Sequence, residues 1–183
     1  MKTYVLLLRG INVGGHKRLL MNDLKLMLAK LGFLNSTTYI QSGNVVFQFC
    51  NLDSISDLEN KVAKKIYETF GFEVPVVIVS KSAMQRIVDS NPFVASNPIE
   101  NLHCTFFKNK PHDIILTALN QEDFGEDECF ITSNSAYIKC NLKYSKSKLT
   151  NGFLEKQIGV GCTTRNWKTT LKLLELCKNM MNK

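Results

Sequence analysis

Residues 6–17 read Leu-Leu-Leu-Arg-Gly-Ile-Asn-Val-Gly-Gly-His-Lys, an apolar segment that continues into a glycine-rich, basic loop. The nearly unbroken apolar residues from Tyr4 to Leu8 are typical of a strand in the middle of a sheet, covered on at least one face. A second polar segment, Gln-Ser-Gly-Asn at 41–44, lies between two β-rich stretches. Together these two segments predict how the first half of the chain is arranged.

The first eighty residues predict the element order β-α-β-β-α-β, which is that of a ferredoxin-like fold. One helix is expected to begin at a cap on Asn22 and to end at Gly32, and another to run from a cap on Ser54 to Gly71. Ser42-Gly43 predicts a two-residue hairpin between the middle strands. The strands are expected at Tyr4–Leu8, Thr37–Gln41, Asn44–Phe49 and Val74–Val79.

The handedness of this fold places the third strand between the first and the second, antiparallel to both. The end of the first strand then lies beside the start of the third. The loop from Arg9 to Lys17 and the turn from Gln41 to Asn44 are therefore expected to meet at one end of the sheet.

The same order is expected a second time, after a helix over Ser82–Ser90 and a linker marked by two Asn-Pro pairs. The segment Tyr-Ile-Gln-Ser-Gly-Asn-Val-Val-Phe at 39–47 is similar to Phe-Ile-Thr-Ser-Asn-Ser-Ala-Tyr-Ile at 130–138, as duplication of one unit would produce. Strands are expected at Leu102–Phe107, Cys129–Thr132, Ala136–Cys140 and Gly161–Thr163, and helices at Asp113–Leu119 and about Ser147–Ile158. A last helix, capped by Asn166, follows.

We therefore expect an α+β protein built from two ferredoxin-like (βαββαβ) halves. Each half would hold an antiparallel sheet with helices packed on one face, and an extra C-terminal helix would follow. The expected domains are a first half at residues 1–80, a helix and linker at 81–100, and a second half with the C-terminal helix at 101–183.

The composition predicts a globular protein, with 183 residues of which 44% are apolar. The apolar stretches are all shorter than the roughly 18 residues that a membrane helix needs, so we expect no membrane association. The six cysteines form no C-x-x-C pair, which favours reduced thiols in a cytoplasmic protein. Neither a metal site nor a cofactor is expected, and the oligomeric state stays open.

Charge is distributed unevenly along the chain, whose formal net charge is +7. Residues 1–48 carry +5 and residues 139–183 carry +8, whereas the segment between them carries −6. Basic ends of this kind predict attraction to anionic partners, or else only a well-solvated surface.

The glycine loop and the polar turn hold the first group of candidate ligand-binding residues. Glycines between a strand and a helix let backbone N–H groups face an anion, and basic side chains add charge. The spacing matches neither G-x-G-x-x-G nor a Walker A loop, and the glycines could instead serve only a tight turn with positive φ. The candidates are Arg9, Gly10, Asn12, Gly14, Gly15, Lys17, Gln41, Ser42 and Asn44.

Two further stretches supply the remaining candidates. Lys148 ends the segment Lys-Tyr-Ser-Lys-Ser-Lys at 143–148, which suits phosphate contact and base stacking or is simply a solvated loop. Thr164, Arg165 and Asn166 precede Trp167 at the start of the last helix. His16 is the one histidine in a plausible site context, but no catalytic arrangement follows from the spacing.

Four of these stretches together closely resemble an uncharacterised bacterial family, domain-of-unknown-function family 1697. They are Leu-Leu-Arg-Gly-Ile-Asn-Val-Gly-Gly, Tyr-Ile-Gln-Ser-Gly-Asn-Val-Val-Phe, Ser-Lys-Leu-Thr-Asn and Thr-Thr-Arg-Asn-Trp. The resemblance implies a small cytoplasmic bacterial protein with two ferredoxin-like halves and implies no activity. The family pattern does not include His16; it is met at Arg9, Gly10, Asn12, Gly14, Gly15, Gln41, Ser42, Gly43, Asn44, Lys148, Thr164, Arg165, Asn166 and Trp167.

Three classes of function remain open at this point. The first is binding of an anionic ligand, with nucleic acid as the favoured class and a phosphorylated small molecule as the other. The second is a structural or protein-interaction module in which the glycine loop only permits close packing. The third is a small-molecule enzyme whose reaction the sequence does not name.

Overall fold

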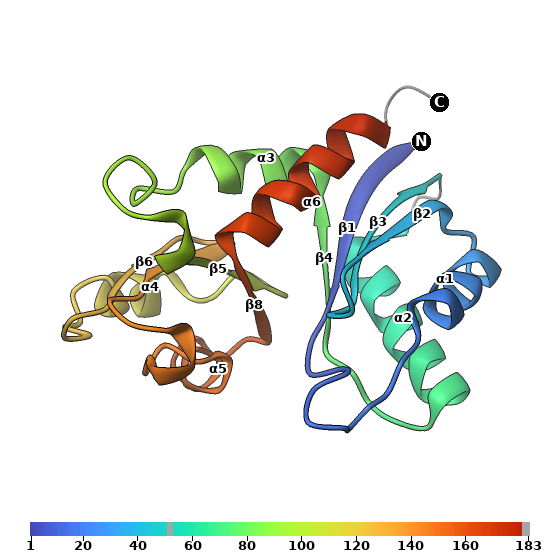
Figure 1. Ribbon diagram of the computed structural model, residues 1–183, viewed down its shortest axis with the longest axis horizontal. Helices are drawn as coiled ribbons and strands as arrows, with labels where there is room; N and C mark the ends of the chain where they lie inside the picture. Colours follow the sequence, from blue (N-terminus) through green and yellow to red (C-terminus); the bar gives the residue numbers. More distant parts are fainter. Residues whose placement is uncertain (51–52, 181–183) are drawn as a thin grey trace. The chain divides into compact units, whose positions relative to one another are not determined.

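The computed structural model describes residues 1–50 and 53–180 (Figure 1). The chain forms two compact units. The first unit comprises Met1–Gln85 together with the C-terminal segment that begins at Lys172, and the second comprises Arg86–Leu171. Each unit contains one four-stranded sheet in which all neighbouring strands are antiparallel.

The first sheet has the strand order β2-β3-β1-β4. The third strand therefore lies between the first two, and Leu7 is paired with Asn44 at the end where the loop and the turn begin. The elements are β1 (Lys2–Leu8), α1 (Met21–Lys30), β2 (Leu34–Tyr39), β3 (Asn44–Phe49), α2 (Ile55–Phe70), β4 (Val76–Ser80) and α3 (Lys81–Asp89).

Helices α1 and α2 cover the same face of this sheet (Figure 1). Leu24 of α1 and Val62 of α2 are buried together with Leu6 and Phe47 of the sheet. Residues that alternate with these along the strands are buried as well, as at Val5, whose exposed fraction is 0%. Strands β1 and β3 are thus buried on both faces, which explains why their sequences are apolar almost without alternation.

The second sheet has the order β6-β7-β5-β8 and repeats the first. Its buried face packs against α4 and α5 through Leu116, Leu154 and Ile158. The elements are η1 (Ile99–Asn101), β5 (Leu102–Phe107), α4 (Asp113–Leu119), β6 (Glu128–Ile131), β7 (Ser135–Lys139), η2 (Tyr144–Lys146), α5 (Asn151–Ile158), β8 (Cys162–Asn166) and α6 (Trp167–Asn179). The α+β fold with two ferredoxin-like halves and a C-terminal helix is confirmed.

The repetition extends to single hydrogen bonds at the end of each central strand. In both units the last strand residue donates its backbone N–H to the hairpin turn, and the next residue donates to the segment before the edge strand. These bonds run from Leu8 to Gly43 (2.8 Å), Arg9 to Pro75 (3.1 Å), Phe107 to Asn134 (3.1 Å) and Lys108 to Gly161 (2.8 Å). The acceptors Gly43 and Asn134 occupy the same place in the two similar sequence segments.

Several predicted helix ends are confirmed by the side chains that cap them. Ser54 Oγ accepts a hydrogen bond from the N–H of Asp57 at 3.1 Å, and Gly71 ends the same helix with φ +78°. Asn166 Oδ1 accepts from the N–H of Thr169 at 2.8 Å. These bonds satisfy backbone groups that a helix end would otherwise leave without a partner.

The prediction that Asn22 caps the first helix is wrong. Helix α1 begins at Met21 after Leu20, whose side chain makes no capping hydrogen bond, and Asn22 lies in the first turn. Met21 is buried in the core, so packing of an apolar side chain sets the start of this helix instead of a polar cap.

The predicted two-residue hairpin at Ser42-Gly43 is also wrong. Tyr39 pairs with Asn44, so the turn has the four residues from Ile40 to Gly43. Both Ile40 (φ +49°) and Gly43 (φ +72°) are in the left-handed region. The longer turn carries the carbonyl of Gln41 beyond the end of the sheet.

Two boundaries in the second unit differ from the prediction by more than one residue. Helix α5 begins at Asn151, because Thr150 Oγ1 accepts from the N–H of Phe153 at 3.2 Å, and Ser147 lies outside it. The last strand extends to Asn166 instead of ending at Thr163, so Thr164 and Arg165 are strand residues.

Among the described residues, no helix has the length and hydropathy that crossing a membrane demands.

His103 is a half-buried histidine on β5. Its ring stacks on Tyr144 with a centroid distance of 4.6 Å, and its Nδ1 lies 4.0 Å from Cys140 Sγ. Burial lowers the pKa of His103 below its usual 6.5, although a hydrogen bond with the backbone of Asn101 opposes this change. The folded protein therefore favours the neutral ring more strongly than the unfolded chain does.

This difference predicts an acid-linked loss of stability. As the pH falls through 6.5, His103 becomes protonated in the unfolded chain but stays neutral in the folded protein. The free energy of unfolding therefore decreases until the pH falls below the lowered pKa of the folded state. In urea unfolding at pH 7.5 and pH 5, wild type should lose more stability on acidification than His103→Phe, which keeps a ring to stack on Tyr144. Equal losses in the two proteins would contradict the prediction.

Candidate functional site

The tip of the glycine loop is a tight turn. The N–H of His16 donates to the carbonyl of Val13 at 3.1 Å, and the N–H of Asn12 donates to the backbone carbonyl of Lys17 at 3.2 Å. The two central residues, Gly14 and Gly15, have φ of +59° and +78°. Positive φ at both central positions is the pattern of type I′ turns, for which glycine is the favoured residue. The turn therefore accounts for both glycines by itself.

The Asn12 side chain fastens this loop to the rest of the unit. Its Nδ2 donates to the carbonyls of Leu19 (2.9 Å) and Gln41 (2.8 Å), and its Oδ1 accepts from the N–H of Leu19 (2.8 Å). One amide thus closes the base of the loop and joins it to the turn 29 residues away. The predicted meeting of the two segments is confirmed, and the Asn12 amide is occupied by backbone partners.

A second set of contacts ties the loop to the chain before β4. Lys17 Nζ donates to the carbonyl of Glu73 at 2.7 Å, and the N–H of Arg9 donates to that of Pro75. An ammonium group has three donors, so Lys17 keeps donors for a further partner. Gly10, with φ +71°, lets the chain leave β1 toward this loop.

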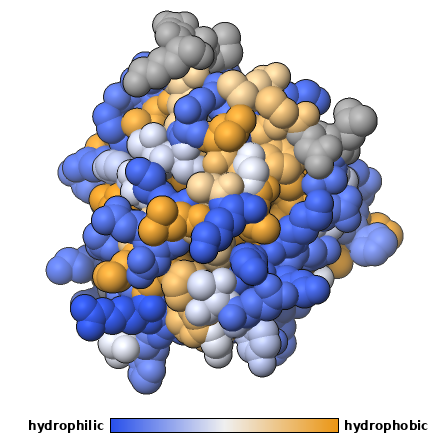
Figure 2. All heavy atoms as spheres, turned by 90° about the vertical axis from the view of Figure 1, so that its right-hand side faces the viewer, coloured by the Kyte–Doolittle hydropathy of each residue, from blue (hydrophilic) through white to orange (hydrophobic). Residues whose placement is uncertain are grey.

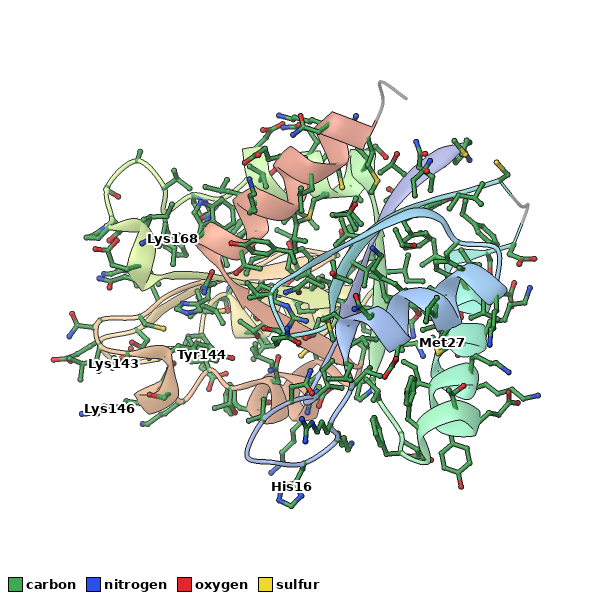
Figure 3. The ribbon with its side chains drawn as sticks, turned by 45° about the vertical axis from the view of Figure 1, so that its right-hand side comes forward. His16, Met27, Lys143, Tyr144, Lys146 and Lys168 are labelled. Carbon is green, nitrogen blue, oxygen red and sulfur yellow. The ribbon has the colours of Figure 1, made fainter. Side chains whose placement is uncertain are left out.

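The outer part of the loop is exposed and basic. Residues 13–18 are all exposed, and they include His16, Lys17 and Arg18. His16 projects away from the sheet at the end of the loop (Figure 3). On the side of the molecule that Figure 2 shows, hydrophilic side chains lie among apolar ones. The loop therefore offers positive charge to solvent from a braced backbone.

The Gln41–Asn44 turn exposes fewer polar side chains than the sequence predicted. Asn44 has an exposed fraction of 0%, and its Nδ2 donates to the carbonyl of Tyr39 at 3.1 Å. Ser42 is half-buried, whereas Gln41 is exposed and gives its carbonyl to Asn12. Of this group, Gln41 has the side chain most open to solvent.

The predicted residues of β8 are held by contacts within the second unit. Thr164 Oγ1 donates to Asn151 Oδ1 at 2.8 Å, and Arg165 Nη1 donates to Thr163 Oγ1 (2.8 Å) and to the carbonyl of Thr164 (2.9 Å). Burial lowers the pKa of Arg165 to about 10. Asn166 caps α6. Each of these side chains therefore has a structural partner.

Lys148 lies beside a hollow of about 250 Å³ in the second unit, which Lys143 and Lys146 also line. The side chains of Lys143 and Lys146 extend outward, whereas Tyr144 turns inward and stacks on His103 (Figure 3). The basic residues of this segment are thus accessible. Its aromatic ring, which the sequence suggested for base stacking, is already stacked inside the unit.

Three residues near the glycine loop were missed by the sequence reasoning. Lys64, Tyr67 and Glu73 line a hollow of about 450 Å³ in the first unit. The available signal was the helical position of Tyr67, an aromatic residue outside the apolar stripe formed by Leu58, Val62 and Ile66. Within the described residues, no group of three His, Cys, Asp or Glu side chains is arranged to hold a metal ion.

Comparison with known proteins supports the fold and gives no activity. Residues 1–137 match the model of a family described as "Protein of unknown function (DUF1697)". The solved structure of the conserved bacterial protein SP0830 from Streptococcus pneumoniae is similar over 96% of this chain and 98% of its own, with a TM-score of 0.72 and 22% identity. No curated protein matches the chain.

The Asn12 bonds predict a large effect of a single amide. Asn12→Ala removes three hydrogen bonds and places alanine at φ +56°, where its Cβ is strained. The free energy of unfolding should therefore fall by about 2–4 kcal/mol. Asn12→Gly removes the same bonds without the backbone strain, so it should lower the free energy of unfolding by less. Urea unfolding of both variants measures the two losses. Unchanged midpoints would show that the Asn12 amide does not stabilise the folded protein.

Gly43 and Gly15 are expected to differ in their tolerance of alanine. A Cβ at Gly43 would lie 2.6 Å from Leu8 Cβ and 2.8 Å from Ile11 Cδ1, in addition to the strain of φ +72°. Gly43→Ala should therefore cost roughly 3 kcal/mol or more. Gly15→Ala meets no atom within 4 Å and should cost only the strain of about 1–2 kcal/mol. Chemical denaturation of the pair checks this, and equal losses would refute the packing argument.

Proposed function

We propose that this chain, which belongs to the DUF1697 family of proteins of unknown function, binds an anionic, phosphate-bearing ligand at the loop Arg9–Arg18. The observation that carries the proposal is the exposed, basic loop held in one shape by the Asn12 side chain. A braced loop loses little conformational entropy when a ligand binds, so its charges act at low cost.

Lys17 and Arg18 are the main ligand contacts in this proposal. Both are exposed, and the ammonium of Lys17 is already positioned by its hydrogen bond to Glu73. The exposed backbone of Gly14 and Gly15 lets a phosphate approach closely. Gln41, at the other side of the Asn12 bonds, supplies an uncharged amide beside the loop.

A phosphorylated small molecule fits this site better than nucleic acid. Ferredoxin-like domains that bind RNA stack bases on an open sheet face. In this chain β1 and β3 are buried on both faces, since Val5, Leu7 and Val46 have exposed fractions of 0%. A nucleic acid would therefore have to bind through the loops alone, by phosphate contacts.

A protein-interaction role is the second candidate, and Val13 favours it. This β-branched side chain is 69% exposed at the tip of the turn, where an apolar residue gains nothing from solvent. A partner surface could cover it.

We also propose a cytoplasmic location, because all six cysteines are free thiols and four of them are buried.

The binding proposal is tested with inorganic pyrophosphate as the probe. In a titration of isotope-labelled protein followed by amide chemical shifts, Gly14, Gly15 and Lys17 should shift in a saturable manner. The double variant Lys17→Ala/Arg18→Ala should bind about tenfold more weakly or worse, because charge-assisted contacts to phosphate are lost.

The matched control is Lys25→Ala/Lys30→Ala, which removes the same charge from exposed positions of α1 and should bind as wild type does. If the two double variants weaken binding equally, only net charge matters and the site is not at the loop. A short single-stranded RNA that binds far more tightly than pyrophosphate, with a steep salt dependence, would favour the nucleic-acid alternative.

A further inference from the structure

The hollow between α2 and the segment before β4 lies next to the glycine loop. It has a volume of about 450 Å³, which is within the range of small-molecule sites, and it is lined by Ala63, Lys64, Tyr67, Glu73, Val74 and Pro75. All of these residues belong to the first unit.

Two hydrogen bonds fix the position of the loop against this lining. Lys17 Nζ donates to the carbonyl of Glu73 at 2.7 Å, and the N–H of Arg9 donates to the carbonyl of Pro75 at 3.1 Å. The ammonium group of Lys17 is thus bonded to a residue that lines the hollow.

The lining combines an aromatic ring with apolar and charged groups. Tyr67 is 56% exposed although its helix buries Val62 and Ile66 on the other side, so its ring is accessible. Val74 and Pro75 add apolar surface. Lys64 is the cation of the lining, and its ion pair with Glu68 is loose at 3.9 Å. Glu73 is the one carboxylate among the six lining residues.

These groups match the parts of a nucleotide. An exposed aromatic ring stacks on a base, because every base has a π-face. A carboxylate accepts hydrogen bonds from ribose hydroxyls, as it does in dinucleotide-binding folds. Ammonium groups bind phosphate. Tyr67, Glu73 and the two lysines supply these three chemistries around one hollow.

We propose that the hollow binds a nucleoside monophosphate, with the base on Tyr67, the ribose at Glu73 and the phosphate between Lys17 and Lys64. This inference rests on the proposed function, since it places the phosphate at the same basic loop. It adds the class of ligand and the residues that recognise it.

The test compares adenosine monophosphate with ribose 5-phosphate, which has the sugar and the phosphate but no base. In amide-shift titrations, the nucleotide should bind wild type about tenfold more tightly, because stacking contributes only for the nucleotide. Tyr67→Ala should remove this difference and leave ribose 5-phosphate binding unchanged, whereas Tyr67→Phe should keep it. The exposure of Tyr67 makes these variants compatible with folding, and their urea midpoints verify it.

The outcomes separate this inference from the proposed function. Equal binding of the two compounds, abolished by Lys17→Ala/Arg18→Ala, overturns the nucleotide site and leaves phosphate binding at the loop intact. Absence of binding by both compounds overturns the inference, and the pyrophosphate titration then decides separately whether the loop binds phosphate. Nucleotide binding that survives the loop variant but not Tyr67→Ala also overturns the inference, because the phosphate would then lie elsewhere. Preference for the nucleotide that needs Tyr67 and the loop supports it.

Discussion

The side-chain amide of Asn12 is the contact on which the first unit's candidate site depends. Its three hydrogen bonds to Leu19 and Gln41 hold a long loop and a hairpin turn at the same end of the sheet. Asn12 itself has φ +56°, which costs about 1–2 kcal/mol for most residues and less for asparagine. The bonds outweigh this strain, since each contributes about 0.5–1.5 kcal/mol.

The two units share one scaffold and differ in the loop that follows the central strand. Both close the end of the central strand with the same pair of backbone hydrogen bonds, and both continue with a basic residue, Arg9 or Lys108. The connection that follows has twelve residues in the first unit, including three glycines, and five glycine-free residues in the second. The scaffold thus fixes where the loop starts, and the additional residues of the first unit give this loop its glycines.

Sequence patterns predicted the parts of the fold that local chemistry decides. The caps on Ser54 and Asn166 were predicted correctly because each side-chain oxygen accepts a hydrogen bond from a backbone N–H in the first turn of its helix. The meeting of the Arg9–Lys17 loop with the Gln41 turn followed from strand order alone. The cap on Asn22 failed because burial of Met21 in the core sets the start of α1, and the short hairpin failed because the strand pairing stops at Tyr39 and Asn44.

The candidate site residues were harder to predict than the fold, because tertiary packing decides which side chains stay exposed. Asn44 and Arg165 have polar side chains that the sequence offers equally to a ligand or to the protein interior, and packing directed them inward. Tyr67 and Glu73 carry no motif, and they became candidates only because the loop lies beside them. Such proximity arises from chain segments far apart in sequence, which periodicity does not register.

The central claim is that one amide joins the loop to the turn, and nuclear Overhauser effects from the Asn12 side-chain NH₂ protons test it most directly. The account predicts cross-peaks from these protons to backbone protons of both the Leu19 region and the Gln41–Ser42 segment. Cross-peaks confined to neighbours of Asn12 within the loop, with none to the turn, would contradict it.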